Sequence, residues 1–178
     1  MGVGATKYRT EELRGWFEVP FYYKEKRVPG QPIVVKIGGS TLGSHDTSLK
    51  DLVSFQQEGG QAVVVHGGGK IVSEWMIKAG VRPKFVGGLR VTDKTVLDIV
   101  VAVLTGVVNK SIVASLQTHG GKSIGISGVD GQMLVARQGK PELGLVGDTV
   151  VASSEPIRAL LDAGYIPVIA PVALCVSE

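Results

Sequence analysis

Short β-branched runs alternate with helix-length segments from residue 33 onward, and this alternation constrains the fold more than any other feature of the chain. Ile33–Ile37 and residues 62–65 are the clearest runs, and both are apolar enough to be strands buried in a sheet. Strands separated by helices are typical of α/β domains whose sheet is parallel. The sequence therefore predicts an α/β fold, a three-layer sandwich with a largely parallel central sheet.

Glycine, proline and capping residues set the expected limits of the other elements. Asp46 is a candidate N-cap for a helix over residues 47–58. A helix ending at Gly80 is expected to bury one face, formed by Ile71, Val72, Trp75, Met76 and Ala79. We expect further helices over 93–117, capped by Thr92 or Asp93, and after 153, with Pro156 in the first turn. Strands are expected at 123–126 and 165–169, and a hairpin or a pair of short strands at 133–137 and 146–152.

The first thirty residues have a different pattern. They place aromatic residues among charges without a clean period, and a Pro-Gly-Gln-Pro sequence follows at 29–32. We interpret 1–30 as an N-terminal extension with a short helix near 10–17, and 31–178 as one substrate-binding domain. The extension could be a strap over the domain's own core or an oligomer contact.

Composition excludes several classes of protein. A single cysteine, Cys175, cannot form an intramolecular disulfide, so a reducing, cytoplasmic compartment is expected. A net charge of +3 with scattered basic residues does not indicate nucleic-acid binding. No apolar run suggests a membrane span. The three histidines are too far apart in sequence to predict a metal site.

Two of the expected strands end in glycine-rich turns. Gly38 and Gly39 follow the first strand, and Gly67 to Gly69 follow the second and lead into a helix. Glycine lets the backbone approach an anion closely, and a helix N-terminus adds free N–H donors. Lys36 lies in the first strand, where a buried cation would need an anionic partner. A phosphate between the two turns would be such a partner, although each turn alone could be only a tight connection.

A third cluster precedes the long helix. Arg90 is its most informative residue, because a guanidinium fork suits a carboxylate bound through two hydrogen bonds. A surface ion pair is the plain alternative. Together with the two glycine turns and two later segments, this cluster forms an ordered set: VKIGG (35–39), VHGGG (65–69), GLRVTD (88–93), GISGVDG (125–131) and GYIPVIA (164–170).

In order and spacing these segments resemble the acetylglutamate kinases, a family that phosphorylates the side-chain carboxylate of N-acetyl-L-glutamate in arginine biosynthesis. The resemblance implies that Lys36 stabilises charge on the transferring phosphoryl group and that Gly38 and Gly39 cradle the phosphates of Mg-ATP. It implies that Gly68 and Gly69 bind N-acetyl-L-glutamate through backbone N–H groups, and that Arg90 holds its α-carboxylate. It also implies a homodimer or higher homo-oligomer through the long helix and a sheet edge.

The resemblance has two departures. Lys70 follows the glycine turn where the family commonly has proline, and the added cation could alter affinity for an acidic ligand. The family also continues into an Asn-containing hairpin and an ATP domain with an aspartate and a second lysine, which 33–172 do not supply. We therefore expect this chain alone to be inactive. Two alternatives stay open: a carrier-linked aminoadipate kinase, and a non-catalytic ligand-binding protein built from the substrate half.

Overall fold

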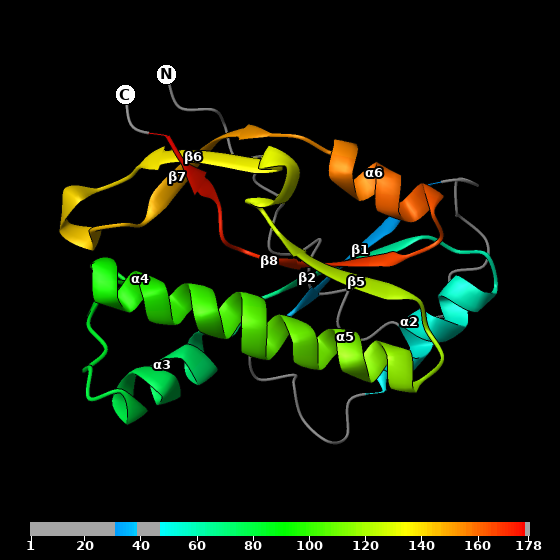
Figure 1. The fold of residues 1–178 in the computed structure, drawn as a ribbon, viewed down its shortest axis with the longest axis horizontal. Helices are drawn as coiled ribbons and strands as arrows, with labels where there is room; N and C mark the ends of the chain where they lie inside the picture. The colour runs from blue at the N-terminus through cyan, green and yellow to red at the C-terminus, as the bar shows by residue number, and fades with distance from the viewer. Residues whose placement is uncertain (1–30, 39–46, 177–178) are drawn as a thin grey trace, which may run out of the picture. The chain divides into compact units, whose positions relative to one another are not determined.

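The computed structural model describes residues 31–38 and 47–176. The expected extension over 1–30, Gly39 and Asp46 lie outside these residues. From Pro32 onward the chain forms one compact unit around a four-stranded parallel sheet (Figure 1). The order in this sheet is β1-β2-β8-β5, with bounds β1 Ile33–Ile37, β2 Ala62–His66, β8 Ile166–Ala170 and β5 Ser123–Ser127.

Helices cover both faces of the sheet, which confirms the predicted three layers (Figure 1). Alternate strand residues such as Ile37 and Val64 pack on one face against the larger group of helices. Val63 and Ile169 point to the other face and pack against Leu161 of the last helix. The helices are α2 Ser48–Gln57, α3 Gly69–Lys78, α4 Lys94–Val101, a π-helical segment η2 Ala102–Val108, α5 Asn109–Thr118 and, on the second face, α6 Glu155–Asp162.

Smaller elements complete the fold. The predicted hairpin is present as β6 and β7, which pair antiparallel, and β9 joins β6 in parallel. A second hairpin, β3 with β4, was not predicted, although its turn residues Gly87 and Gly88 both have positive φ, 56° and 81°. The bounds are β3 Phe85–Val86, β4 Leu89–Arg90, β6 Leu134–Gln138, β7 Gly147–Ala152 and β9 Leu174–Cys175, with single 3₁₀ turns at Asp130–Gln132 and Pro141–Leu143.

Helix α3 corrects one prediction about the core. Val72 and Met76, four residues apart, are buried, but Trp75 is 43% exposed and Ala79 is also exposed. The helix meets the core along a narrow stripe, so positions one residue away from that stripe reach solvent. Trp75 instead lies beneath the Lys78 ammonium, which is 5.8 Å from its ring centroid.

The long helix formed by α4, η2 and α5 is more apolar than the sequence analysis recognised. Lys94–Thr118 has a mean hydropathy of 2.0 over its best 18-residue window, so by length and composition alone it is apolar enough to cross a membrane, which the sequence interpretation had not noted. Its buried residues, such as Val103, Ile112 and Leu116, pack against the sheet in the main core. This packing buries 33% of that window, so it accounts for one side of the helix.

The long helix begins at a side-chain cap. Asp93, one of the two predicted caps, accepts a hydrogen bond from the Val96 amide at 2.8 Å. At the start of α2, by contrast, Thr47 occupies the N-cap position and makes no side-chain cap bond. The Asp93 carboxylate therefore satisfies a helix N–H that would otherwise lack a partner.

Replacing this cap should cost stability. We expect Asp93→Ala to lower the free energy of unfolding by about 0.5–2 kcal/mol, because the Val96 amide loses its acceptor. Asp93→Asn keeps a capping oxygen and should lose less. Urea unfolding of both variants measures the difference, and an equal loss in the two would contradict the capping role.

Candidate functional site

Gly38 and the Gly67–Gly69 turn lie side by side at one edge of the central sheet. Strands β1 and β2 are parallel and pair Ile37 with His66, the last residue of each. The Gly67 amide donates to the Ile37 carbonyl at 3.0 Å, which continues the ladder past both strand ends. Gly38 and Gly67 are therefore neighbours, as the prediction of a shared site requires. In open parallel sheets, ligands bind at this carboxyl edge.

Gly68 is fitted tightly between the turn and the long helix. It is the N-cap of α3, with φ 159° and ψ 18°. A Cβ atom at this position would lie 2.8 Å from Leu104 Cδ2 and 3.2 Å from Val108 Cγ2. Glycine is thus needed here for space, and its lack of a side chain leaves the first N–H groups of α3 without a capping oxygen.

Lys36 is not buried, although the sequence analysis expected a buried cation at this position. Its register partner is Val65, but its own side chain is exposed, like that of Val34 on the same face of the strand. The reason is that β1 is an edge strand among the described residues, so its second face is only partly covered. The inference that a buried cation demands an anion at Lys36 was therefore wrong, and its role rests on position alone.

Arg90 is held against the first turns of α3. Its Nη2 group donates to the Gly69 carbonyl at 2.9 Å and to Ser73 Oγ at 2.8 Å, while Nη1 lies 3.0 Å from Met76 Sδ. The guanidinium carbon is 4.8 Å from the centroid of the Phe85 ring. The β3–β4 hairpin carries both Phe85 and Arg90, and so places the cation beside the glycine turn.

The charge of Arg90 has neutral neighbours. Its contacts are a carbonyl, a hydroxyl, a thioether and an aromatic ring, and no carboxylate in the described part of the chain forms an ion pair with it. The surface ion pair considered from sequence is therefore absent from those residues. Burial of the guanidinium lowers the pKa of Arg90, yet an arginine stays charged at neutral pH. A fixed cation with only neutral partners is suited to an anionic ligand.

The chain after Arg90 is tied to the loop between β6 and β7. The buried Thr92 donates its amide to the Leu143 carbonyl at 2.9 Å and accepts from the Leu145 amide at 2.6 Å. Thr92 Oγ1 also donates to the Arg90 carbonyl at 3.1 Å. Gly144, with φ 69°, permits this approach because a Cβ there would lie 2.4 Å from the Thr92 oxygen. These bonds fix the backbone that presents Arg90.

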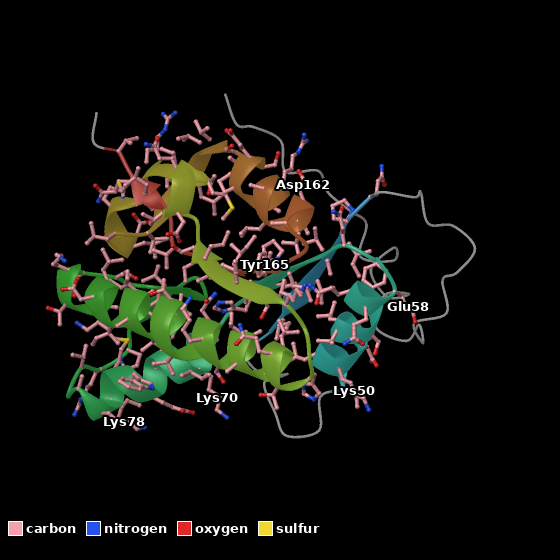
Figure 2. All side chains as sticks on the ribbon, turned by 45° about the vertical axis from the view of Figure 1, so that its right-hand side comes forward. Lys50, Glu58, Lys70, Lys78, Asp162 and Tyr165 are labelled. Atoms are coloured by element: carbon pink, nitrogen blue, oxygen red, sulfur yellow. The ribbon has the colours of Figure 1, made fainter. Side chains whose placement is uncertain are left out.

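Sequence reasoning missed several residues that build this site. Ser73, Met76 and Phe85 orient Arg90. Met76 was expected only as a core residue, and the one sequence signal for Ser73 was its four-residue spacing from Gly69 on one helix face. Lys70, noted as a departure, lies exposed in the first turn of α3, with Lys78 in the last turn (Figure 2).

Two other kinds of candidate site were considered among the described residues: a metal cluster and a cavity. No three His, Cys, Asp or Glu side chains within 31–38 and 47–176 come together as metal ligands. A cavity of about 180 Å³ lies at the opposite edge of the sheet, and its lining carries no charged side chain. That lining is Gln56, Gly59, Gly60, Gln61, Ala62, Leu161, Gly164, Tyr165 and Ile166.

The fit of Gly68 leads to a test within one turn. We expect Gly68→Ala to lower the urea midpoint of unfolding, because its methyl group must displace Leu104. Gly69→Ala is the matched control, since a Cβ there meets nothing within 4 Å. Adding Leu104→Ala to Gly68→Ala should cost less than the two single losses combined. Equal effects of the two glycine substitutions would contradict the packing described here.

The chain is similar to known proteins over most of its length. Residues 31–178 match the model of the amino acid kinase family. The chain is 46% identical over 147 residues to an acetylglutamate kinase of Dehalococcoides mccartyi, covering 83% of this chain and 54% of that protein. It is 46% identical to the acetylglutamate kinase of Archaeoglobus fulgidus, covering 79% of this chain and 53% of that one. The chain thus spans about half the length of these curated relatives.

Solved structures give the same fold. A crystal structure of a Streptococcus mutans protein aligns with a TM-score of 0.72 at 31% identity, covering 78% of this chain and 58% of that one. N-acetylglutamate synthase from Neisseria gonorrhoeae, complexed with coenzyme A and N-acetyl-glutamate, aligns with a TM-score of 0.66 at 24% identity, over 82% of this chain and 34% of that one. The second likeness concerns the fold alone. With the family match spanning 31–178, the chain belongs to the amino acid kinase family.

Proposed function

We propose that this chain forms the N-acetyl-L-glutamate-binding part of an acetylglutamate kinase. The observation that carries the proposal is the placement of Arg90, a cation with neutral partners held beside a glycine turn and a helix N-terminus. Acetylglutamate kinases at 42–46% identity support the choice of substrate. In this proposal the complete protein transfers a phosphoryl group from ATP to the side-chain carboxylate of N-acetyl-L-glutamate.

The substrate would be held from two sides. Arg90 would bind the α-carboxylate with guanidinium N–H groups that remain beyond those given to Gly69 and Ser73. The backbone N–H groups of Gly68 and Gly69 would donate to substrate oxygens at the start of α3, where the helix dipole also favours negative charge. Both supports are fixed by packing before ligand arrives, which reduces the entropy lost on binding.

The nucleotide would approach the neighbouring turn. Gly38 and Gly39 would cradle the phosphates of ATP, and the exposed Lys36 would be available to the transferring group. Magnesium would arrive with the nucleotide as Mg-ATP, and no described residue is assigned to it.

The reaction itself would be a direct in-line transfer. An oxygen of the substrate's side-chain carboxylate forms a bond to the γ-phosphorus, and the bond from that phosphorus to the β–γ bridging oxygen breaks. ADP leaves with the electron pair, and the product is an acyl phosphate. Such a transfer depends on positioning and on stabilising charge rather than on a protein nucleophile. The turns and the Lys36 cation would serve those two needs.

The long helix supports the expectation of a homo-oligomer. Ala102, Gly106 and Val107 lie exposed on it, and Val107 is 39% exposed. Small and apolar residues on the solvent side of an already apolar helix are suited to close packing against a second copy. A homodimer through this helix is therefore part of the proposal.

The central test is the affinity for N-acetyl-L-glutamate. A charge-assisted hydrogen bond contributes about 1.5–3 kcal/mol, so Arg90→Ala should weaken binding about ten- to a hundredfold. Arg90→Lys keeps the charge but loses the guanidinium fork, so its affinity should lie between those of the wild type and Arg90→Ala. Calorimetric titration of each variant with N-acetyl-L-glutamate gives the dissociation constants.

Arg158→Ala is the matched control, because it removes an exposed arginine from α6 on the other face of the sheet. It should leave the affinity unchanged. Unchanged affinity in folded Arg90→Ala would overturn the assignment of this residue. Tighter binding of N-acetyl-2-aminoadipate than of N-acetyl-L-glutamate would favour a carrier-linked aminoadipate kinase instead.

A further inference from the structure

A buried polar pair lies directly behind the glycine turn. Asn109, the first residue of α5, is 1% exposed, and His66, the last residue of β2, is 2% exposed. Both sit among apolar side chains of the main core, where a polar group is costly unless its hydrogen bonds are made. Nothing in the proposed phosphoryl transfer uses either residue, so the burial of two polar side chains there needs a separate explanation.

Asn109 joins three strands of the central sheet. Its Nδ2 group donates to the Val168 carbonyl of β8 at 2.9 Å, and it lies 3.4 Å from the Ile126 carbonyl of β5. The same group lies 3.2 Å from His66 Nε2 on β2. One side chain of the long helix thus contacts the three adjacent strands β2, β8 and β5, and its contact on β2, His66, is the residue that leads into the glycine turn.

These contacts determine which nitrogen of His66 carries the proton. The amide nitrogen must face the Val168 carbonyl, because the amide oxygen would be repelled there. Its second N–H lies between the Ile126 carbonyl and His66 Nε2, and only an Nε2 without a hydrogen fits 3.2 Å from that amide group. His66 Nδ1 is therefore the protonated nitrogen, and it donates to the Gly67 carbonyl at 2.8 Å. A chain of hydrogen bonds runs from β8 through Asn109 and His66 to the first glycine of the turn.

We propose that Asn109 and His66 form a buried relay that positions the Gly67–Gly69 turn, and that the relay holds only while His66 is neutral. Asn109 and His66 are positioning residues, since neither reaches the space where a ligand would bind. The relay as a device of the fold does not need the proposed function, but its effect on N-acetyl-L-glutamate binding rests on it.

Close packing around the relay shows that the surrounding backbone is adapted to it. A Cβ atom on Gly125 of β5 would lie 1.8 Å from Asn109 Oδ1, so only glycine leaves room for the amide. On the side of the glycine turn, Leu104 and Val108 of the π-helical segment lie so close to Gly68 that they leave no room for a Cβ atom there. A π-helical turn changes the direction of the side chains that follow it, and such segments are frequent at functional sites. Here it immediately precedes Asn109.

The charged groups around the pair favour a neutral imidazole. On α5, the Lys110 ammonium lies 3.1 Å from Asn109 Oδ1 and 3.0 Å from the Gly125 carbonyl, and its charge opposes a second cation nearby. On β1, Lys36 points to the opposite face, because Ile37 is the register partner of His66. Strands β8 and β5 carry no titratable side chain, and Asp130 beyond β5 is bonded to Ser127 at 2.6 Å.

Acid should open the relay. Protonated His66 would present an N–H to the Asn109 amide, so one hydrogen bond would be lost and a charge would be buried. Burial lowers the pKa of His66 from its ordinary 6.5, while its bond to Gly67 raises it less. Because the folded pKa lies below the unfolded one, the unfolded chain binds the proton first. The stabilisation is complete above about pH 6.5 and declines as the pH falls below it, by up to about tenfold in the unfolding constant per pH unit.

Nuclear magnetic resonance of the ¹⁵N-labelled chain between pH 8 and pH 5 tests the relay without any ligand. We expect His66 to show the Nδ1–H tautomer at pH 8 and to titrate with a pKa below 6.5. The amide signals of Gly67, Gly68 and Gly69 should shift with the same midpoint. An Nε2–H tautomer, or glycine amides that do not follow His66, would overturn the proposal.

Two substitutions sharpen this test. Asn109→Leu should uncouple the glycine amides from His66, and Asn109→Asp, which offers an acceptor, should move the His66 pKa upward instead of downward. His119→Gln, at an exposed histidine on the last turn of the long helix, is the control and should change neither readout. If the Asn109 variants do not fold, the titration of the wild-type chain still tests the relay.

Ligand binding is then measured separately. The affinity for N-acetyl-L-glutamate should fall as the pH passes below the His66 midpoint, and Asn109→Leu should bind weakly at every pH. Absence of binding by the wild-type chain at pH 8 would overturn the proposed function while leaving the tautomer result intact. Binding that ignores the His66 titration would overturn the positioning role.

Discussion

Parallel pairing of β1 with β2, in the register that sets Ile37 opposite His66, is the constraint on which the site depends. It places Gly38 beside the Gly67–Gly69 turn at one edge of the sheet and lets the Gly67 amide donate a hydrogen bond to the Ile37 carbonyl. A shift of one residue would turn His66 away from the long helix and break its bond to Asn109. The β1–β2 register, the Gly67–Gly69 turn and the position of the long helix therefore depend on one another.

Around this edge the chain holds a cation in place without neutralising it. Arg90 is fixed by a carbonyl, a hydroxyl, a sulfur and a ring, so that its orientation is set while its charge stays free for a ligand. The hydrogen bonds between Thr92 and the β6–β7 loop hold the backbone that carries Arg90 in place. Such an arrangement recognises a carboxylate by geometry as well as by charge.

The sequence predicted the layers and most elements, because strand runs and glycine stops are local signals. It failed where tertiary contacts decide. Lys36 was taken as buried, but exposure depends on which strands lie beside β1; Trp75 was taken as core, but α3 buries only a narrow stripe. The β3–β4 hairpin did have a local signal in Gly87 and Gly88, and it was overlooked. Asn109 had one too, as an amide within an apolar helix, but its partners come from three distant strands.

The measurement that tests the account most directly is the location of the ligand. Adding N-acetyl-L-glutamate to the ¹⁵N-labelled chain should shift the backbone amides of Gly67–Ser73 and of Leu89–Thr92, because those segments carry the turn and Arg90. Amides around Gln56 and Tyr165, at the opposite edge of the sheet, should not move. Shifts confined to that opposite edge, with the glycine turn unchanged, would contradict the central claim.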